Sequence, residues 1–215
     1  MDIDASEKEQ VESLKKWWKG NGTSIVSGVL IGASVLFGSK AWFSYQDKQQ
    51  LAASDAYAQM LDAMDKNNPE QARSFANIVI SKYSGTRYAP LTALGLAKIA
   101  VNEGSLEAAR VQLEWAVSHA GSLEIEHTSR LRLIRVLIGL QDYSAASDML
   151  AKATDSGVYA YQYTALKGDY ELAQGNKEAA RTAYRQALDS MPEQAVDRAY
   201  LQAKFDSIAV VDSEA

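Results

Sequence analysis

The sequence contains no cysteine, which excludes disulfide bonds and thiolate metal sites. Histidine is almost as scarce: His119 and His127 are the only two, and their spacing does not form the HExxH motif of a zinc site. We expect both histidines to have surface or loop roles. Nucleophile elbows, phosphate-binding glycine loops and dinucleotide fingerprints are also missing. The sequence therefore predicts no catalytic residues, no metal and no cofactor, and a protein that is not an enzyme.

The chain has no long basic run, and its net charge is −5. A nucleic-acid-binding surface needs clustered cations, so we expect no nucleic-acid partner. Proline is rare, with three residues in 215, while Ala, Leu, Glu, Gln and Lys are frequent. These residues favour helix over sheet. Composition therefore predicts an all-α fold.

One long stretch, from Gly20 to Ser39, contains no charged residue. About 20 apolar residues in a helix cross a hydrocarbon core of about 30 Å. Trp17 and Trp18 precede the stretch and Trp42 follows it, as aromatic residues do at the two membrane interfaces. We expect a transmembrane helix over residues 23–43 that places the chain in a lipid bilayer.

A cleaved signal peptide is the main alternative for this stretch. The region before a signal peptide's apolar core is basic, whereas here it carries the acids Asp2, Asp4, Glu7, Glu9 and Glu12. The sequence Ser39-Lys40-Ala41 is also a poor cleavage site. We therefore expect an uncleaved anchor.

Lysines set the expected orientation of the anchor. Lys8, Lys15, Lys16 and Lys19 come before the span, whereas only Lys40 and Lys48 follow it closely. The positive-inside rule then places a tail of residues 1–22 in the cytoplasm and residues 44–215 outside the inner membrane. Within the span, Ser24, Gly28 and Gly32 form a face of small residues that would let another helix approach closely.

The part after the span contains a repeated pattern of small and bulky residues. Leading alanines stand at Ala109, Ala146 and Ala180, so the intervals are 37 and 34 residues. In the best copy, Ala180 is followed by Tyr184 and Ala187. A period near 34 is typical of tetratricopeptide repeats, in which pairs of antiparallel helices stack into an α-solenoid. A generic helical bundle with alanine-rich interfaces is the alternative.

Turn residues divide this part into the expected helices. Asn68 should cap a helix that has Pro69 at its first position. Gly and Ser mark most of the later breaks. After a helix that continues from the span through residues 44–65, we expect helices near 70–83, 88–103, 106–120, 127–140, 143–155, 160–174, 177–190 and 193–208, the last capping the stack.

The first helix of each repeat should line a concave surface that binds an extended or helical peptide mainly by apolar burial. The candidates are Leu91, Leu94, Lys98 and Val101 in one repeat, Leu131, Arg135 and Ile138 in the next, and Gln162, Ala165, Asp169 and Leu172 in the last. Several of these leucines would equally suit the core. A clamp for a terminal carboxylate would need Lys and Asn on adjacent first helices, a set that we do not find.

The sequence also contains a cluster of tyrosines and a cluster of arginines. Tyr159, Tyr161 and Tyr163 either recognise a partner or wedge neighbouring helices together. Arg130, Arg132 and Arg135 lie on one expected helix and are interpreted as a solvated face.

Several local strings resemble the YfgM family, the ancillary subunits of the bacterial SecYEG translocon. They are Asn21-Gly22 with the apolar span and Trp42 after it, Leu106-Glu107-Ala108-Ala109, and the stretch from Lys167-Gly168-Asp169 to Gly175-Asn176-Lys177. The resemblance covers nearly the whole chain, although the first repeat departs from the usual pattern. It implies an inner-membrane protein with a periplasmic repeat domain. It also implies association with SecYEG and with the membrane-anchored foldase PpiD, and transfer of emerging chains to periplasmic chaperones.

The sequence thus predicts a membrane-anchored protein-interaction module. A regulator that sequesters a signalling protein through the same repeats is the alternative, and a repeat domain in the cytoplasm would favour it. A structural dimer held by the Gly28 and Gly32 face is a further hypothesis.

Overall fold

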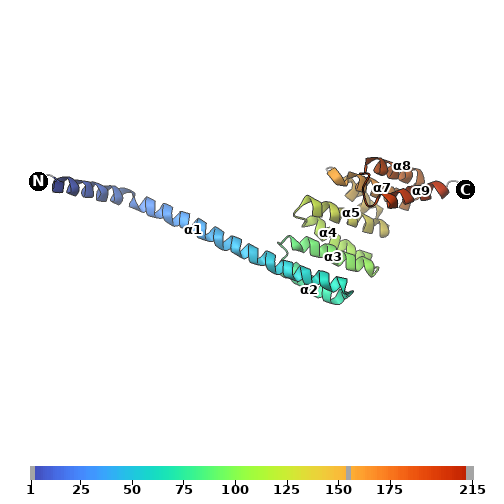
Figure 1. Ribbon diagram of the computed structural model, residues 1–215, viewed down its shortest axis with the longest axis horizontal. Helices are drawn as coiled ribbons and strands as arrows, with labels where there is room; N and C mark the ends of the chain where they lie inside the picture. Colours follow the sequence, from blue (N-terminus) through green and yellow to red (C-terminus); the bar gives the residue numbers. More distant parts are fainter. Residues whose placement is uncertain (1–2, 154–155, 212–215) are drawn as a thin grey trace. The chain divides into compact units, whose positions relative to one another are not determined.

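In a computed structural model of the chain, the described residues are 3–153 and 156–211, and they form helices joined by short turns without any strand (Figure 1). The chain divides into two compact units, Met1–Leu51 and Ala52–Ala215. The predicted all-α fold is confirmed for this part of the chain.

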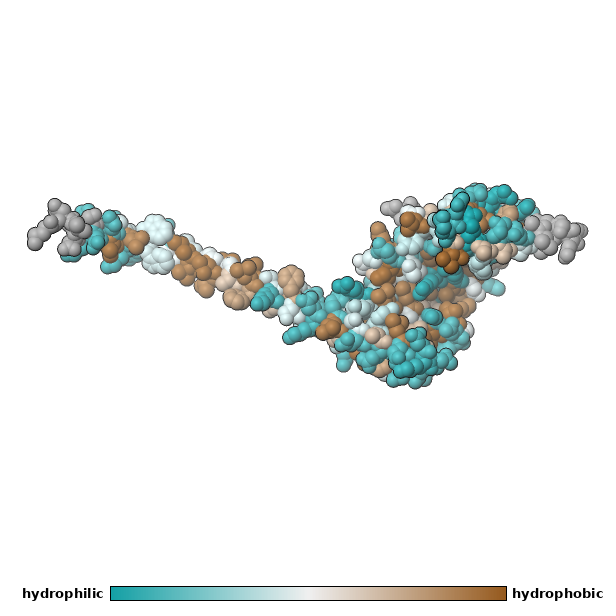
Figure 2. All heavy atoms as spheres, in the orientation of Figure 1, coloured by the Kyte–Doolittle hydropathy of each residue, from teal (hydrophilic) through white to brown (hydrophobic). Residues whose placement is uncertain are grey.

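Helix α1 (Ile3–Asp65) begins in the first unit and contains the uncharged stretch. Among the described residues it is the one helix long and apolar enough to cross a membrane. On the face drawn in Figure 2, apolar side chains cover the middle of α1. The Ser34 hydroxyl donates to the Leu30 carbonyl oxygen at 2.8 Å, so this polar group is satisfied within its own helix, as a lipid environment requires.

The end of α1 belongs to the second unit. The helix that the sequence places after the span is continuous with it, because α1 ends only at Asp65. Ala53, Met60 and Ala63 on this last part are buried, and Met60 packs in one cluster with Ala76 of the next helix. The last turns of α1 therefore serve as the first helix of the first repeat.

The remaining helices follow the expected order. They are α2 (Pro69–Lys82), α3 (Tyr88–Asn102), α4 (Leu106–Ser118), α5 (Leu123–Gly139), α6 (Tyr143–Ala151), a 3₁₀ turn η1 (Gly157–Tyr159), α7 (Ala160–Ala173), α8 (Lys177–Ser190) and α9 (Arg198–Val211). Consecutive helices from α2 onward pack against one another, and α5 also contacts α3 and α7. This is the connectivity of stacked helical hairpins.

Side-chain caps explain where several helices begin. Asn68 accepts a hydrogen bond from the Gln71 amide at 3.1 Å, with Pro69 at the start of α2, as predicted. Asp142 accepts from the Ala145 amide at 3.1 Å at the start of α6. Each cap satisfies a backbone N–H that has no partner inside the helix.

Three predicted boundaries were wrong. Helix α5 begins at Leu123 rather than near 127, because Ser122 caps it by accepting from the Ile125 amide. Helix α6 ends at Ala151, before the expected residue 155, which with 154 lies outside the described residues. Helix α9 begins at Arg198 rather than 193, since the Ala195 amide closes a turn on the Pro192 carbonyl.

The repeat alanines are core residues. Ala109, Ala146 and Ala180 are each fully buried, and so are Leu113 and Tyr184, the bulky residues of two copies. Leu113 packs with buried residues of α3, α4, α5 and α6 in the largest core cluster. Small residues let the two helices of a pair approach, and the bulky residue fills the space against the next pair.

The α5–α7 interface contains the tyrosine cluster and one of the histidines. His127 was expected in a surface or loop role, but it is only 5% exposed, and its Nδ1 lies 2.9 Å from the Tyr163 hydroxyl. Tyr159 stacks on the same imidazole at 4.8 Å between ring centroids. Tyr159 and Tyr163 therefore wedge two helices together instead of facing solvent.

Helix α9 packs against α8 and ends the stack. Leu201 and Ile208 are buried in a cluster with Tyr184. Lys204 forms an ion pair of 2.6 Å with Asp169 of α7. Asp169, a candidate for the concave surface, is thus held by the capping helix.

Candidate protein-binding groove

A groove of about 400 Å³ lies between α3 and α5 of the second unit, with α4 at its base. We refer to it as the α3–α5 groove. Its lining residues are Leu94, Ala97, Lys98, Val101 and Asn102 of α3, Leu106 and Leu113 of α4, and Arg132, Arg135 and Val136 of α5.

Helical periodicity places these side chains together. Lys98, Val101 and Asn102 are spaced i, i+3 and i+4, so they share one face of α3. Arg132 and Arg135, with the residue after them, repeat the same spacing on α5. Two successive repeats therefore contribute one helical face each to the groove.

The floor of the groove is apolar because it is the edge of the core. Leu94, Leu113 and Val136 belong to the largest buried cluster, and their relative exposures are at most 7%. Val101, at the rim, is 44% exposed. A ligand side chain in the groove would thus contact a preformed apolar surface.

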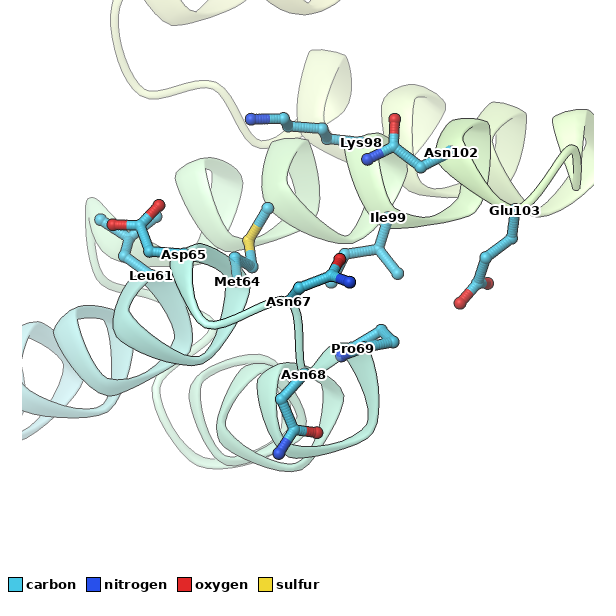
Figure 3. Close-up of a pocket in the computed structure, with 10 residues that line it drawn as sticks. All are labelled: Leu61, Met64, Asp65, Asn67, Asn68, Pro69, Lys98, Ile99, Asn102 and Glu103. Carbon is cyan, nitrogen blue, oxygen red and sulfur yellow. The ribbon is translucent and has the colours of Figure 1, made fainter.

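A second hollow, of about 310 Å³, adjoins the α3–α5 groove. Figure 3 shows that its lining comes from the end of α1, the turn before α2, and α3. Lys98 and Asn102 line both hollows, and the close-up shows them on the same side of α3. A bound segment could therefore continue from one hollow into the other.

The electrostatics of the groove are positive. Lys98, Arg132 and Arg135 are exposed, and no carboxylate is among the described residues that line the groove. Burial raises the pKa of the Tyr57 hydroxyl, and the positive charge of Arg132 partly opposes that rise. The field of Arg132 thus reaches the last part of α1.

Comparison with known proteins gives consistent matches over almost the whole chain. The sequence model of the protein family described as "Tetratricopeptide repeat-like domain" matches residues 15–210 of this chain. Relatives named "Ancillary SecYEG translocon subunit" include one from Haemophilus influenzae, 30% identical over 86% of this chain and 89% of the relative. The relative from Escherichia coli (strain K12) is 27% identical over 98% of this chain and all of its own length, and that from Aggregatibacter actinomycetemcomitans is 29% identical over 94% and 97%.

The chain belongs to the tetratricopeptide-like family of ancillary SecYEG translocon subunits. Families of this kind work through protein–protein contacts, and the predicted resemblance is confirmed. Within the part of the chain that the structure describes, no cluster of His, Asp or Glu is arranged to hold a metal ion. The lining residues of the groove offer apolar surface, hydrogen-bond donors and positive charge.

The structure brings four of the predicted concave residues of this family member into the α3–α5 groove. They are Leu94, Lys98, Val101 and Arg135. Leu94, Lys98 and Val101 come from α3 of one repeat, and Arg135 comes from α5 of the next. Their role in binding remains a prediction.

The other candidates for the concave surface do not line the groove. Leu131 is 5% exposed and packs against Tyr163 and Leu166 of α7, so it is a core residue and we withdraw it from the surface. Leu91 and Ile138 are half-buried against the core. Leu172 is 37% exposed on α7 and does not line the groove. Spacing alone did not show that stacking of α7 on α5 would cover one side of each first helix.

Sequence reasoning missed several lining residues of the groove. Arg132 was interpreted as part of a solvated face, and Asn102 was not singled out. The i, i+4 step from Lys98 to Asn102 and the i, i+3 step from Arg132 to Arg135 were available signals. Leu106 and Leu113 had no such signal, because they belong to the second helix of their repeat and reach the groove from below.

The candidate helix-packing residues lie in the first unit, on α1. Ser24, Gly28 and Gly32 are exposed, and a Cβ added at Gly28 or Gly32 would meet nothing within 4 Å. The small-residue face is therefore open to another helix, and its use stays a prediction.

Proposed function

We propose that this protein is an ancillary subunit of the SecYEG translocon that presents its repeat domain to chains or partner proteins at the membrane. The observation that carries the proposal is the similarity to proteins of that name over almost the whole length of both chains. A helix long and apolar enough to span a membrane supports it, since SecYEG is a membrane complex.

The proposed membrane arrangement is single-pass in the inner membrane. Residues 23–43 would cross the bilayer, residues 1–22 would lie in the cytoplasm, and residues 44–215 would lie in the periplasm. The lysines before the span favour this orientation. Anchoring would raise the local concentration of the repeats at the translocon exit, so modest affinity for a client would suffice.

The proposed task is the transfer of emerging protein chains to periplasmic chaperones, in association with the membrane-anchored foldase PpiD. The α3–α5 groove supports a binding role because it combines an apolar floor with unpaired cations at its rim. No enzymatic step is part of the proposal.

Co-purification tests the assembly. The full-length tagged protein would be solubilised from membranes in mild detergent, captured and analysed by mass spectrometry. We expect recovery of SecY, SecE, SecG and PpiD. A variant with an unrelated membrane span in place of residues 23–43 is the matched control, because it keeps the repeats and the anchoring. Loss of SecYEG in the control assigns the contact to the span, and retention assigns it to the repeats. Recovery of no translocon subunit by the intact wild-type protein would contradict the proposal.

Protease accessibility tests the orientation. In intact spheroplasts, external protease should digest the repeat domain, whereas in inverted inner-membrane vesicles the domain should be protected. The opposite pattern would place the repeats in the cytoplasm. It would favour the alternative function, a regulator that sequesters a signalling protein.

For the small-residue face, we propose contact with another membrane helix. Replacing Gly28 and Gly32 with Ile would remove the close approach. Val29→Ile with Val35→Ile serves as the control, since both sites are already occupied by exposed branched side chains. If the glycine variant alone loses self-association or translocon association in membranes, the face is the contact. If it behaves like the control, the proposal for this face is wrong.

A further inference from the structure

The exposed cations at the α3–α5 groove differ from Arg73 and Arg110 of the repeat domain, which are half-buried and paired with acids. Arg73 forms ion pairs with Glu70 and Glu103, and Arg110 does so with Glu114 and Asp142. Lys98, Arg132 and Arg135 form no ion pair with any residue that the structure describes. Three positive charges thus remain without a counter-charge around one groove in a chain whose net charge is −5.

These charges stand on both sides of the groove. Lys98 stands on α3, and Arg132 and Arg135 stand on α5, with the apolar floor between the two helices. Asn102 adds an amide that can donate a hydrogen bond beside Lys98. A ligand that satisfies both rims while filling the floor needs apolar side chains with carboxylates on either side of them.

The groove also shares two lining residues with the adjoining hollow. Because Lys98 and Asn102 line the adjoining hollow as well, a bound chain can continue past the groove instead of terminating in it. This favours an internal segment of a protein over the carboxylate of a chain end. Burial on the apolar floor supplies most of the affinity, because one buried leucine outweighs an exposed ion pair. The cations then select for acidic neighbours and speed association.

We propose that the α3–α5 groove binds an internal segment of a partner protein in which apolar side chains are flanked by aspartate or glutamate. The inference rests on the proposed function, because it names the chemistry of the segment that the repeat domain binds. The charge complementarity of Lys98, Arg132 and Arg135 carries it.

The test measures peptide binding by the full-length protein in a neutral detergent. The probes are fluorescently labelled synthetic peptides of equal length with amidated ends: one combines leucine with glutamate, one has glutamine in place of every glutamate, and one has lysine. Anisotropy titrations would be made at low and at high salt. We expect the glutamate peptide to bind at least about tenfold more tightly than the glutamine peptide, with the difference shrinking as salt is added.

Matched variants then assign the site. Arg132→Glu with Arg135→Glu should weaken binding of the glutamate peptide at least about tenfold. It should also shift the preference of the groove toward the lysine peptide. Lys152→Glu with Lys167→Glu makes the same change of net charge at exposed positions that do not line the groove, and should bind as the wild type does. Circular dichroism on both variants shows that the helices are intact.

Several outcomes would overturn the proposal. Equal binding of the glutamate and glutamine peptides would do so, as would an unchanged affinity in the groove variant. Displacement of the peptide by phosphatidylglycerol added to the micelles would reassign the cations to lipid headgroups. Residues 212–215 of this chain also contain two acids, Asp212 and Glu214. If removing residues 212–215 strengthened peptide binding, the groove's occupant would be this chain itself.

The two proposals fail separately. Capture of SecYEG by the wild-type protein tests the proposed function without any peptide, whereas peptide selectivity tests the groove without the translocon. A wild-type protein that captures SecYEG but shows no acidic preference contradicts the inference alone. One that prefers the acidic peptide but captures no translocon subunit contradicts the proposed function.

Discussion

The Tyr184 hydroxyl donates a hydrogen bond of 2.6 Å to the Asp169 carboxylate, and this bond joins α8 to α7 beneath the capping helix. Tyr184 is fully buried, and the same carboxylate accepts from Lys204 of α9 at 2.6 Å. The Asp169 carboxylate thus joins α7 to both α8 and α9. Ionisation of the buried Tyr184 phenol would place a second negative charge beside this carboxylate.

This arrangement predicts alkaline sensitivity of the repeat domain. Burial, and then the hydrogen bond to Asp169, raise the pKa of Tyr184 far above its ordinary value near 10. The folded state therefore holds this proton more tightly than the unfolded state. Its contribution to stability is complete below about pH 10 and is lost progressively above that, by up to about 1.4 kcal/mol per pH unit.

Urea unfolding followed by circular dichroism from about pH 8 to about pH 11 would measure the effect. The Tyr184→Phe variant should lose stability less steeply with rising pH than the wild type. The Tyr45→Phe variant removes a tyrosine from α1 outside the repeat domain and should keep the wild-type slope. Identical slopes for wild type and Tyr184→Phe would show that Tyr184 does not set the alkaline limit.

Gly168 predicts a second effect on stability. A Cβ added to this buried glycine would overlap the Tyr184 ring. Alanine would gain up to about 1 kcal/mol in helix propensity, but overpacking costs about 1–3 kcal/mol, so Gly168→Ala should be net destabilising. Gly85→Ala is the control, because a Cβ there meets nothing within 4 Å.

A double-mutant cycle identifies the cause. If the clash with the ring is responsible, Gly168→Ala should cost much less in a Tyr184→Leu background than in the wild type. The measurement is the urea midpoint of the wild type, of each single variant and of the double variant. If Gly168→Ala destabilised both backgrounds equally, a clash with the Tyr184 ring would not be the cause.

The buried contact between His127 and Tyr163 predicts a third effect. Tyr163→Phe removes the hydroxyl 2.9 Å from His127 Nδ1 and leaves a buried polar atom without that partner. Such a loss costs about 1–3 kcal/mol. Tyr161→Phe is the matched control, since the Tyr161 hydroxyl makes only long contacts, 3.5 Å to Asp197 and 3.3 Å from Gln162, and their loss should cost less.

Hydrogen exchange would show where the Tyr163→Phe variant loosens. Faster exchange should concentrate in α5 and α7, the two helices that the contact joins. A uniform change over all the repeats, or none, would argue against a local role for this pair.

Membrane anchoring gives a fourth prediction. Arginine at the centre of a membrane helix costs about 2.5–3.5 kcal/mol on insertion scales. Val29→Arg together with Leu30→Arg should therefore shift the protein from the pellet to the supernatant after alkaline carbonate washing. Val111→Arg on α4, where the valine is 59% exposed, should leave the protein in the pellet. A double arginine variant that resists carbonate would mean that this stretch does not hold the protein in lipid.

Helices with local signals were predictable from the sequence, and contacts between distant residues were not. The Asn68-Pro69 pair gave the start of α2, because a cap and an N1 proline act within one turn. The start of α5 was misplaced because Ser122 was interpreted only as a break between helices, whereas its side chain caps α5. The burial of His127 had no local signal, because its partner Tyr163 lies 36 residues away on α7.

In the candidate site, too, residues with a local signal were predicted, and residues whose surroundings depend on distant parts of the chain were not. Lys98, Val101 and Arg135 were predicted because first helices of repeats present a periodic face. Leu131 was misassigned because its neighbours Tyr163 and Leu166 belong to a later repeat, and only the stacking of α7 on α5 covers it. The missing counter-charges of Arg132 and Arg135 were also invisible in the sequence, since acids such as Asp142 lie close along the chain but pair with Arg110 instead.

Because the α3–α5 groove draws its two walls from successive helical hairpins, no isolated hairpin possesses it. Its width depends on the angle at which those hairpins rest on each other. Any event that changes this angle, such as strain from a bound neighbour, would separate the two walls of the groove while each helix stays folded. Release of the segment that we propose to bind there would then need only a small slip between neighbouring hairpins, without unfolding of the protein.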